Sequence, residues 1–161
     1  MRMITPFDPE HITPDVSLNR VFIMDLPGVP LDDDVRGHRA GEVLSAGALA
    51  ALVRAHAAAL DLAAADLSDD SRLLLRLDDC LVADDSVVRG TARQIARQYG
   101  RRLGYLLLTL KRGDAANRAA RAEWDDSYWA YWAGIRQIWL GGGLMSGRTG
   151  QGPRPHMWAP P

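Results

Sequence analysis

The chain has 161 residues, of which 47% are apolar and 24% are charged, and its formal net charge is −1. This composition is typical of a single soluble globular domain. Cys80 is the only cysteine, which excludes an internal disulfide and a cysteine-based zinc cluster within one chain. The apolar runs are too short to span a bilayer and the N-terminus lacks the apolar segment of a signal peptide, so we expect a cytoplasmic protein without a membrane partner.

The charge is unevenly distributed along the chain. Residues 1–85 contain 16 acidic and 7 basic side chains, whereas residues 86–161 contain 4 acidic and 12 basic ones. Such asymmetry is typical of a nucleic-acid surface or of two halves that pack against each other. We favour the second interpretation, because no base-reading polar side chains alternate with the arginines.

Residues 1–19 are predicted to form an extended arm, residues 20–147 a single helical α/β domain, and residues 148–161 an irregular tail rich in proline and glycine. Within the domain, the β-branched and aromatic run at residues 20–26 predicts a strand that stops at Pro27. Residues 27–41 contain prolines, glycines and three consecutive aspartates, which predicts a mobile loop.

Alanine and leucine predominate after this loop and predict a helix from about residue 40 to residue 65. Asp66 or Ser68 is expected to start the next helix, and the run Asp84-Asp85-Ser86 to cap a longer one. Gly113 is expected to end the longer helix. Its apolar residues recur every three or four positions and therefore share one face: Val88, Ala92, Ile95, Tyr99, Leu103, Leu106 and Leu110.

The last predicted elements lead to a glycine cluster. Asp114 is expected to cap a further helix, and residues 128–133 are also predicted to be helical. Residues 135–140 then read as a short buried strand that runs directly into Gly141-Gly142-Gly143. Glycines at the end of a strand let the backbone approach a ligand closely, because no Cβ intervenes.

Two stretches together resemble a known family. The helix YGRRLGYLLLTL, followed by IWLGGGLMSG, is similar to the C-terminal lobe of ROK-type sugar kinases, which belong to the superfamily of sugar kinases, heat-shock ATPases and actin. The resemblance implies a partial actin-like, ribonuclease H-like ATPase lobe: predominantly helical α/β, with a minimal sheet. It implies that ATP is bound on its adenosine side, with Mg²⁺ entering only together with ATP. The residues implied at this site are Gly141, Gly142, Gly143, Leu144 and Ser146.

The same resemblance also implies what the chain cannot do alone. The family's first phosphate-binding loop, Asp-x-Gly-x-Thr, and the Asn-Asp pair that supplies its catalytic base are not found in the sequence. We therefore expect a truncated or degenerate bacterial family member that binds nucleotide weakly and has no catalytic residue of its own.

An alternative function comes from the aromatic residues between positions 124 and 139. They could form a stacking platform, or a non-enzymatic surface for self-association or for a partner chain. We favour the interpretation that they fill a core, with Tyr128, Trp132 and Trp139 buried and Trp129 half exposed. The cluster consists of Trp124, Tyr128, Trp129, Tyr131, Trp132 and Trp139.

The remaining candidate side chains are expected to have structural roles. The arginines at positions 89, 93, 97 and 101 recur every four residues and predict a solvated helix face rather than a phosphate-binding row. Most paired aspartates stand where helices are predicted to start and are expected to cap them. Asp125-Asp126 is the pair that we retain as a candidate for acid–base chemistry. The four histidines lack metal-ligand spacing, and Cys80 is expected to be a small buried hydrophobe.

Overall fold

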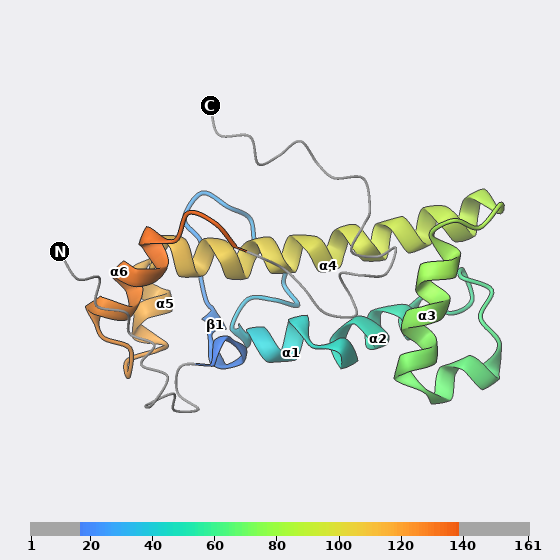
Figure 1. The fold of residues 1–161 in the computed structure, drawn as a ribbon, viewed down its shortest axis with the longest axis horizontal. Helices are drawn as coiled ribbons and strands as arrows, with labels where there is room; N and C mark the ends of the chain where they lie inside the picture. The colour runs from blue at the N-terminus through green and yellow to red at the C-terminus, as the bar shows by residue number, and fades with distance from the viewer. Residues whose placement is uncertain (1–16, 139–161) are drawn as a thin grey trace. The chain divides into compact units, whose positions relative to one another are not determined.

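The computed structural model describes residues 17–138, and these form a predominantly helical fold with one small sheet (Figure 1). A 3-10 turn at Leu18–Arg20 leads into strand β1 (Phe22–Ile23), which pairs antiparallel with β2 (His38–Arg39). In this register Phe22 lies opposite Arg39 and Ile23 opposite His38. The predicted strand at residues 20–26 is thus confirmed only for two residues, whereas its partner β2 lies in a segment that was expected to be a loop.

The helices follow in chain order and agree in part with the expectation. They are α1 (Ala40–Leu44), α2 (Ala46–Ala55), α3 (Asp70–Cys80), α4 (Ser86–Arg112), α5 (Ala115–Ala119) and α6 (Asp126–Gly134), with a 3-10 helix at Ala64–Ser68 between α2 and α3. Within the described residues, no helix combines the length and apolar character that crossing a membrane requires.

The single helix expected over residues 40–65 is wrong. The first helix ends before Ser45, where the backbone is extended, and the second helix ends at Ala55. A turn follows, in which Asp61 adopts a positive φ of 51° and Leu60 becomes buried. Alanine-rich composition favours helix locally, but the burial of Leu60 in a core outweighs that small preference.

The described residues fall into two compact units. The first contains residues 17–45 and Gly100–Ile138, and the second contains Ala46–Tyr99. The core of the first unit consists of side chains from β1, the following loop, α1, the second half of α4 and the aromatic segment. These side chains are Val21, Ile23, Leu26, Leu31, Val35, Ala40, Val43, Tyr105, Leu106, Leu110, Trp124 and Trp129.

The second unit has its own core, contributed by α2, α3 and the first half of α4. The expected apolar stripe of α4 is confirmed here by Ala92 and Ile95, both fully buried, with Val88 and Tyr99 packed partly buried beside them. Cys80 is buried in the same cluster, as expected, and burial raises the pKa of its thiol. The buried residues of this core are Leu49, Ala50, Val53, Leu60, Leu73, Leu77, Cys80, Ala92 and Ile95.

The helix caps show how local sequence determines the helix ends. The Asp85 carboxylate accepts hydrogen bonds from the backbone N–H groups of Val87 (2.7 Å) and Val88 (3.0 Å), which confirms the expected cap of α4. These bonds lower the pKa of Asp85. Helix α3 is capped by Asp69 rather than by Asp66 or Ser68, because Asp66 and Ser68 belong to the preceding 3-10 helix. Gly113 follows α4 with a φ of +53°, as its predicted role as the terminating residue requires.

Candidate functional site

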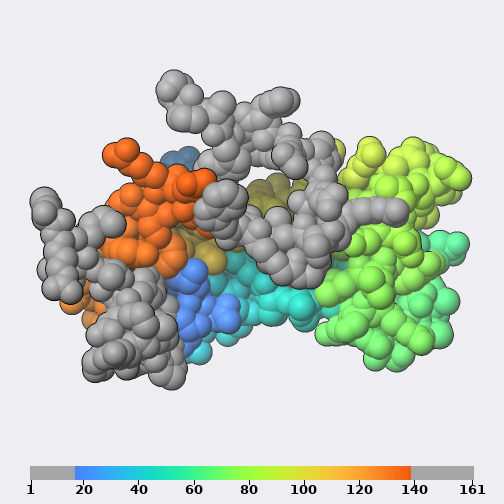
Figure 2. Space-filling model, viewed as in Figure 1, coloured from blue at the N-terminus to red at the C-terminus, as the bar shows by residue number. Residues whose placement is uncertain are grey.

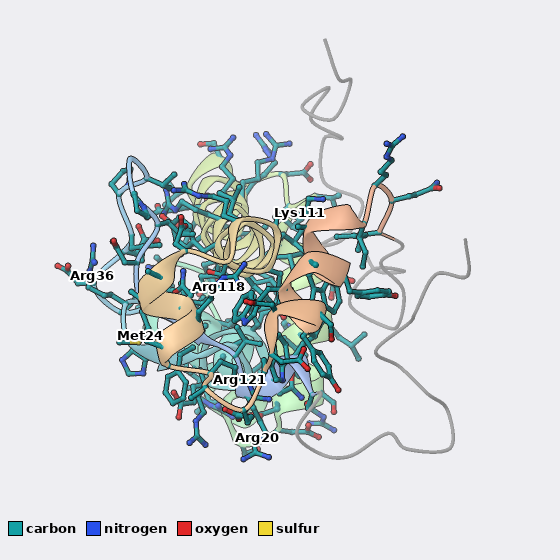
Figure 3. The ribbon with its side chains drawn as sticks, turned by 90° about the vertical axis from the view of Figure 1, so that its left-hand side faces the viewer. Arg20, Met24, Arg36, Lys111, Arg118 and Arg121 are labelled. Carbon is teal, nitrogen blue, oxygen red and sulfur yellow. The ribbon has the colours of Figure 1, made fainter. Side chains whose placement is uncertain are left out.

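The C-terminal end of α6 is bound by a side chain from the end of α4. Lys111, on the last turn of α4, donates from Nζ to the carbonyl oxygens of Ala133 and Ile135, each at 2.5 Å. Figure 3 looks onto this end of the unit and labels Lys111. An ammonium group at a helix C-terminus satisfies carbonyls that have no intrahelical partner and is favoured by the helix dipole. Lys111 therefore holds the exit from α6 in place.

The predicted strand at residues 135–140 is wrong for the part that the structure describes. Residues 135–138 form neither helix nor strand, three of the four are exposed, and Ile138 retains 40% of its accessible surface. A segment rich in β-branched and aromatic residues forms a strand only where a neighbouring strand shares backbone hydrogen bonds with it. Within the described residues the sheet consists of β1 and β2, and residues 135–138 do not pair with either strand. The implied adenosine-side residues Gly141, Gly142, Gly143, Leu144 and Ser146 lie outside the described residues, as does Trp139.

The helical motif that carries the family resemblance forms the second half of α4. Its polar side chains bind the loop between the two strands. The Tyr105 hydroxyl donates to the carbonyl of Pro30 (3.1 Å) and to the Asp32 carboxylate (3.3 Å), and Arg101 pairs with Asp32 at 3.1 Å. Burial, and then the negative charge of Asp32, raise the pKa of Tyr105. The loop that was expected to be mobile is thus held by α4.

Arg102 is a buried charge that the sequence analysis missed. Its guanidinium pairs with Asp34 and donates to the Val43 carbonyl at 3.2 Å, and the residue is only 5% exposed. A buried arginine requires such partners, because an unpaired charge in a core is strongly destabilising. Arg102 follows Tyr99 by three residues and precedes Leu106 by four, so it lies beside the apolar stripe of α4. This spacing was the feature of the sequence that could have predicted its burial.

Among the described residues of the aromatic cluster, Trp124 and Trp129 are buried, and Tyr128, Tyr131 and Trp132 are partly buried. Trp124 stacks on Tyr128 and meets Trp129 edge to face, with both ring centroids 5.4 Å away. Trp124 is 5% exposed and Trp129 only 2%, so the expectation that Trp129 is half exposed is wrong. Arg118 lies over the Trp129 ring and Arg121 over the Trp124 ring, and Figure 3 labels both arginines. Tyr128 and Trp132 pack against this core partly buried.

The paired aspartates act as caps and ion-pair partners. Asp125 caps α6 by accepting from Ser127 N (2.9 Å), Tyr128 N (3.3 Å) and the Ser127 hydroxyl (2.6 Å), and these bonds lower its pKa, that from the Ser127 side chain most. Asp126 pairs with Arg118 at 2.6 Å. A lowered pKa makes Asp125 a weaker general base, and both carboxylates have structural partners, Asp125 in the cap of α6 and Asp126 in the ion pair with Arg118.

A buried asparagine is a second polar residue that the sequence analysis missed. Asn117, in α5, is 1% exposed. Its Oδ1 accepts from Met24 N (2.8 Å) and Asp25 N (3.3 Å), and its Nδ2 donates to the Asp25 carbonyl (2.6 Å). The side chain thus pairs with the backbone that continues β1, much as a neighbouring strand would. An asparagine within an alanine-rich helix was the only sequence signal for this contact.

The described histidines have local partners. His38 pairs with Glu42 at 3.4 Å, and His56 Nδ1 lies 2.9 Å from the Leu52 carbonyl oxygen. No group of three or more histidine, cysteine or acidic side chains that could hold a metal occurs within residues 17–138.

Comparisons with known proteins leave the family open. No protein-family model matches the chain, and searches of curated proteins and of solved structures gave no significant match.

Proposed function

We propose that the chain is a nucleotide-binding lobe of the kind found in ROK-type sugar kinases. In this proposal the backbone of Gly141, Gly142 and Gly143 contacts the adenosine of ATP, and Leu144 and Ser146 lie beside it. Mg²⁺ would accompany the phosphates. The proposal covers binding of nucleotide and assigns no residue of this chain to phosphoryl transfer.

One observation carries the proposal: the helical motif of the resemblance is joined to the end of α6, which precedes the glycine motif in the chain. The motif YGRRLGYLLLTL lies entirely within α4, as the resemblance requires, and α4 ends beside the exit from α6. Lys111 links the two through the carbonyl oxygens of Ala133 and Ile135. The glycine motif begins only six residues after Ile135. A fixed starting point so close to a ligand-binding segment reduces the entropy lost when that segment binds.

Calorimetric titration with ADP and ATP, each with Mg²⁺ at millimolar concentration, tests the proposal. The full chain should give saturable heat. Gly142→Trp should abolish it, because an indole fills the space that a bare backbone leaves for the ligand. Gly100→Trp is the matched control, since a Cβ at Gly100 meets nothing within 4 Å and the residue is exposed. The control should bind like the wild type.

Absence of saturable heat from the wild-type chain, shown by circular dichroism to be folded, would overturn the proposal. Equal binding by the wild type and Gly142→Trp would also overturn it, because the nucleotide would then bind elsewhere.

A further inference from the structure

Within the described residues, the backbone passes between the two compact units at two places. It leaves the first unit between Ser45 and Ala46 and returns to it between Tyr99 and Gly100, inside α4. In residues 17–138, no side chain belongs to both hydrophobic cores. Units with separate cores move relative to each other by default, and the backbone that connects them absorbs the motion.

The first connection is one extended residue between two helices. Helix α1 ends at Leu44 and α2 begins at Ala46, and the backbone of Ser45 between them has φ −71° and ψ 162°. Ser45 is exposed. A residue that lies between two helices can change its backbone angles without breaking the hydrogen bonds inside either helix. This connection therefore has the properties of a pivot.

The second connection contains a glycine that packing does not require. Tyr99 packs against the second core, whereas Arg101 pairs with Asp32 of the first unit at 3.1 Å. Gly100 lies between them and has no side chain with which to bind either unit. It is exposed, its φ is not positive, and a Cβ added there would meet nothing within 4 Å. The consequence of a glycine at this position is a locally weaker helix.

A second glycine, one turn later, weakens the same part of α4. A Cβ added at Gly104 would also meet nothing within 4 Å. In an α-helix the N–H of residue 104 donates to the carbonyl oxygen of residue 100, so this hydrogen bond joins two glycines. The turns on either side are held by the cores, since Ile95 is fully buried in the second and Tyr105 is 5% exposed in the first. Residues 100–104 are therefore the part of α4 that bends most easily.

We propose that α4 bends at residues 100–104 while Ser45 acts as a second pivot, so that the two units reorient as rigid bodies. In such a hinge motion each core keeps its contacts, and only the backbone angles at the pivots change. The motion differs from local unfolding, in which the contacts of a core are lost. This inference does not depend on nucleotide binding.

Distances between two spin labels on the full chain test the hinge. Leu75→Cys in α3 and Ala130→Cys in α6 place one label in each unit, at exposed positions. Figure 2 shows both helices at the molecular surface, α3 in green and α6 in orange. Leu75→Cys with Gln94→Cys is the reference pair, because both positions lie in the second unit. Cys80→Ala in every labelled chain restricts labelling to the introduced thiols. The distribution of distances between the units should be broader than that within the second unit.

Alanine substitutions identify the pivot in α4. Gly100→Ala and Gly104→Ala should each lower the population of bent chains about fivefold and so narrow the distribution between the units, because alanine favours helix over glycine by about that factor. Gly90→Ala is the matched control. It changes an exposed glycine of the same helix, with equally open surroundings, that lies within the second unit. It should leave the distribution unchanged.

Hydrogen exchange of the unlabelled chain, which keeps Cys80, provides an independent measurement. Measured residue by residue, the amides of residues 101–104 should exchange faster than those of the flanking turns of α4, and Gly100→Ala should slow them. A distribution between the units that is as narrow as the reference would overturn the proposal. So would a distribution that Gly100→Ala leaves unchanged or that Gly90→Ala narrows equally, or uniform exchange along α4.

Discussion

At the residue scale, the first unit depends on polar side chains that substitute for missing backbone partners. The sheet contains two residues in each strand, and the backbone that continues β1 finds its partners on Asn117 instead of on another strand. Arg102 and Tyr105 bind the following loop in a similar way. Each of these side chains is largely buried, so its hydrogen bonds are made away from competing water and their loss is costly.

Substitution of Asn117 tests this dependence. Asn117→Ala removes the two hydrogen bonds that Oδ1 accepts from Met24 N and Asp25 N and the one that Nδ2 donates to the Asp25 carbonyl. These partly buried backbone groups then lose their partner on Asn117. We expect a loss of about 3 kcal/mol in the free energy of unfolding, measured by urea denaturation. Ala116→Ser, at an exposed position of the same helix, should change it little. Equal stability of Asn117→Ala and the wild type would show that the contact contributes nothing to stability.

At the element scale, the C-terminal end of α4 is determined by Gly113. Gly113 has a positive φ, and a Cβ there would lie 3.0 Å from Cε3 of the buried Trp129 and 3.2 Å from the Arg118 guanidinium. The same glycine thus allows the chain to turn out of the helix and the indole to pack against the turn. An alanine at this position would meet both a backbone penalty and a steric one.

Gly113→Ala should therefore destabilise the chain by about 2 kcal/mol, measured by thermal or urea unfolding. Gly100→Ala is the matched control on the same helix. It is exposed, and a Cβ there meets nothing within 4 Å. It should stabilise the chain by up to about 1 kcal/mol, because alanine favours helix over glycine. The same sign of effect for both variants would contradict this account of the helix end.

The elements that could be predicted from the sequence are those that nearby residues determine. The stripe of α4, its cap at Asp85 and its end at Gly113 follow from residues within a few turns of one another. Helix α6 was likewise predictable from residues 128–133. The strand at residues 135–140 was not, because a strand requires a distant partner, and composition alone says nothing of whether that partner exists. The adenosine-side glycines remain a prediction, since they lie outside the described residues.

At the scale of the whole molecule, the described chain contains two separate cores, and α4 contributes to both. Residues 88–99 of this helix belong to the core of the second unit, and residues 105–110 belong to that of the first. The predicted pairing of an acidic first half with a basic second half is seen within the first unit, where Asp32 and Asp34 bind Arg101 and Arg102. These two ion pairs join the acidic first half of the sequence to its basic second half.

Two separate cores predict that damage to one is local. Leu77 is fully buried in the second core and Leu110 is 1% exposed in the first. Either residue changed to alanine should cost about 2–5 kcal/mol, because a cavity remains where the side chain was. Hydrogen exchange measured peptide by peptide should then show faster exchange mainly in Ala46–Tyr99 for Leu77→Ala. For Leu110→Ala the faster exchange should fall in residues 17–45 and Gly100–Ile138.

The comparison of the two leucine variants decides how the cores cooperate, because each variant serves as the control for the other. The same pattern of lost protection in both, spread evenly over residues 17–138, would contradict local damage and mean that the two cores unfold as one cooperative unit. Opposite patterns would mean that each core opens with its own free energy. In that case the two units unfold separately, although α4 continues without a break from Tyr99 in one unit to Gly100 in the other.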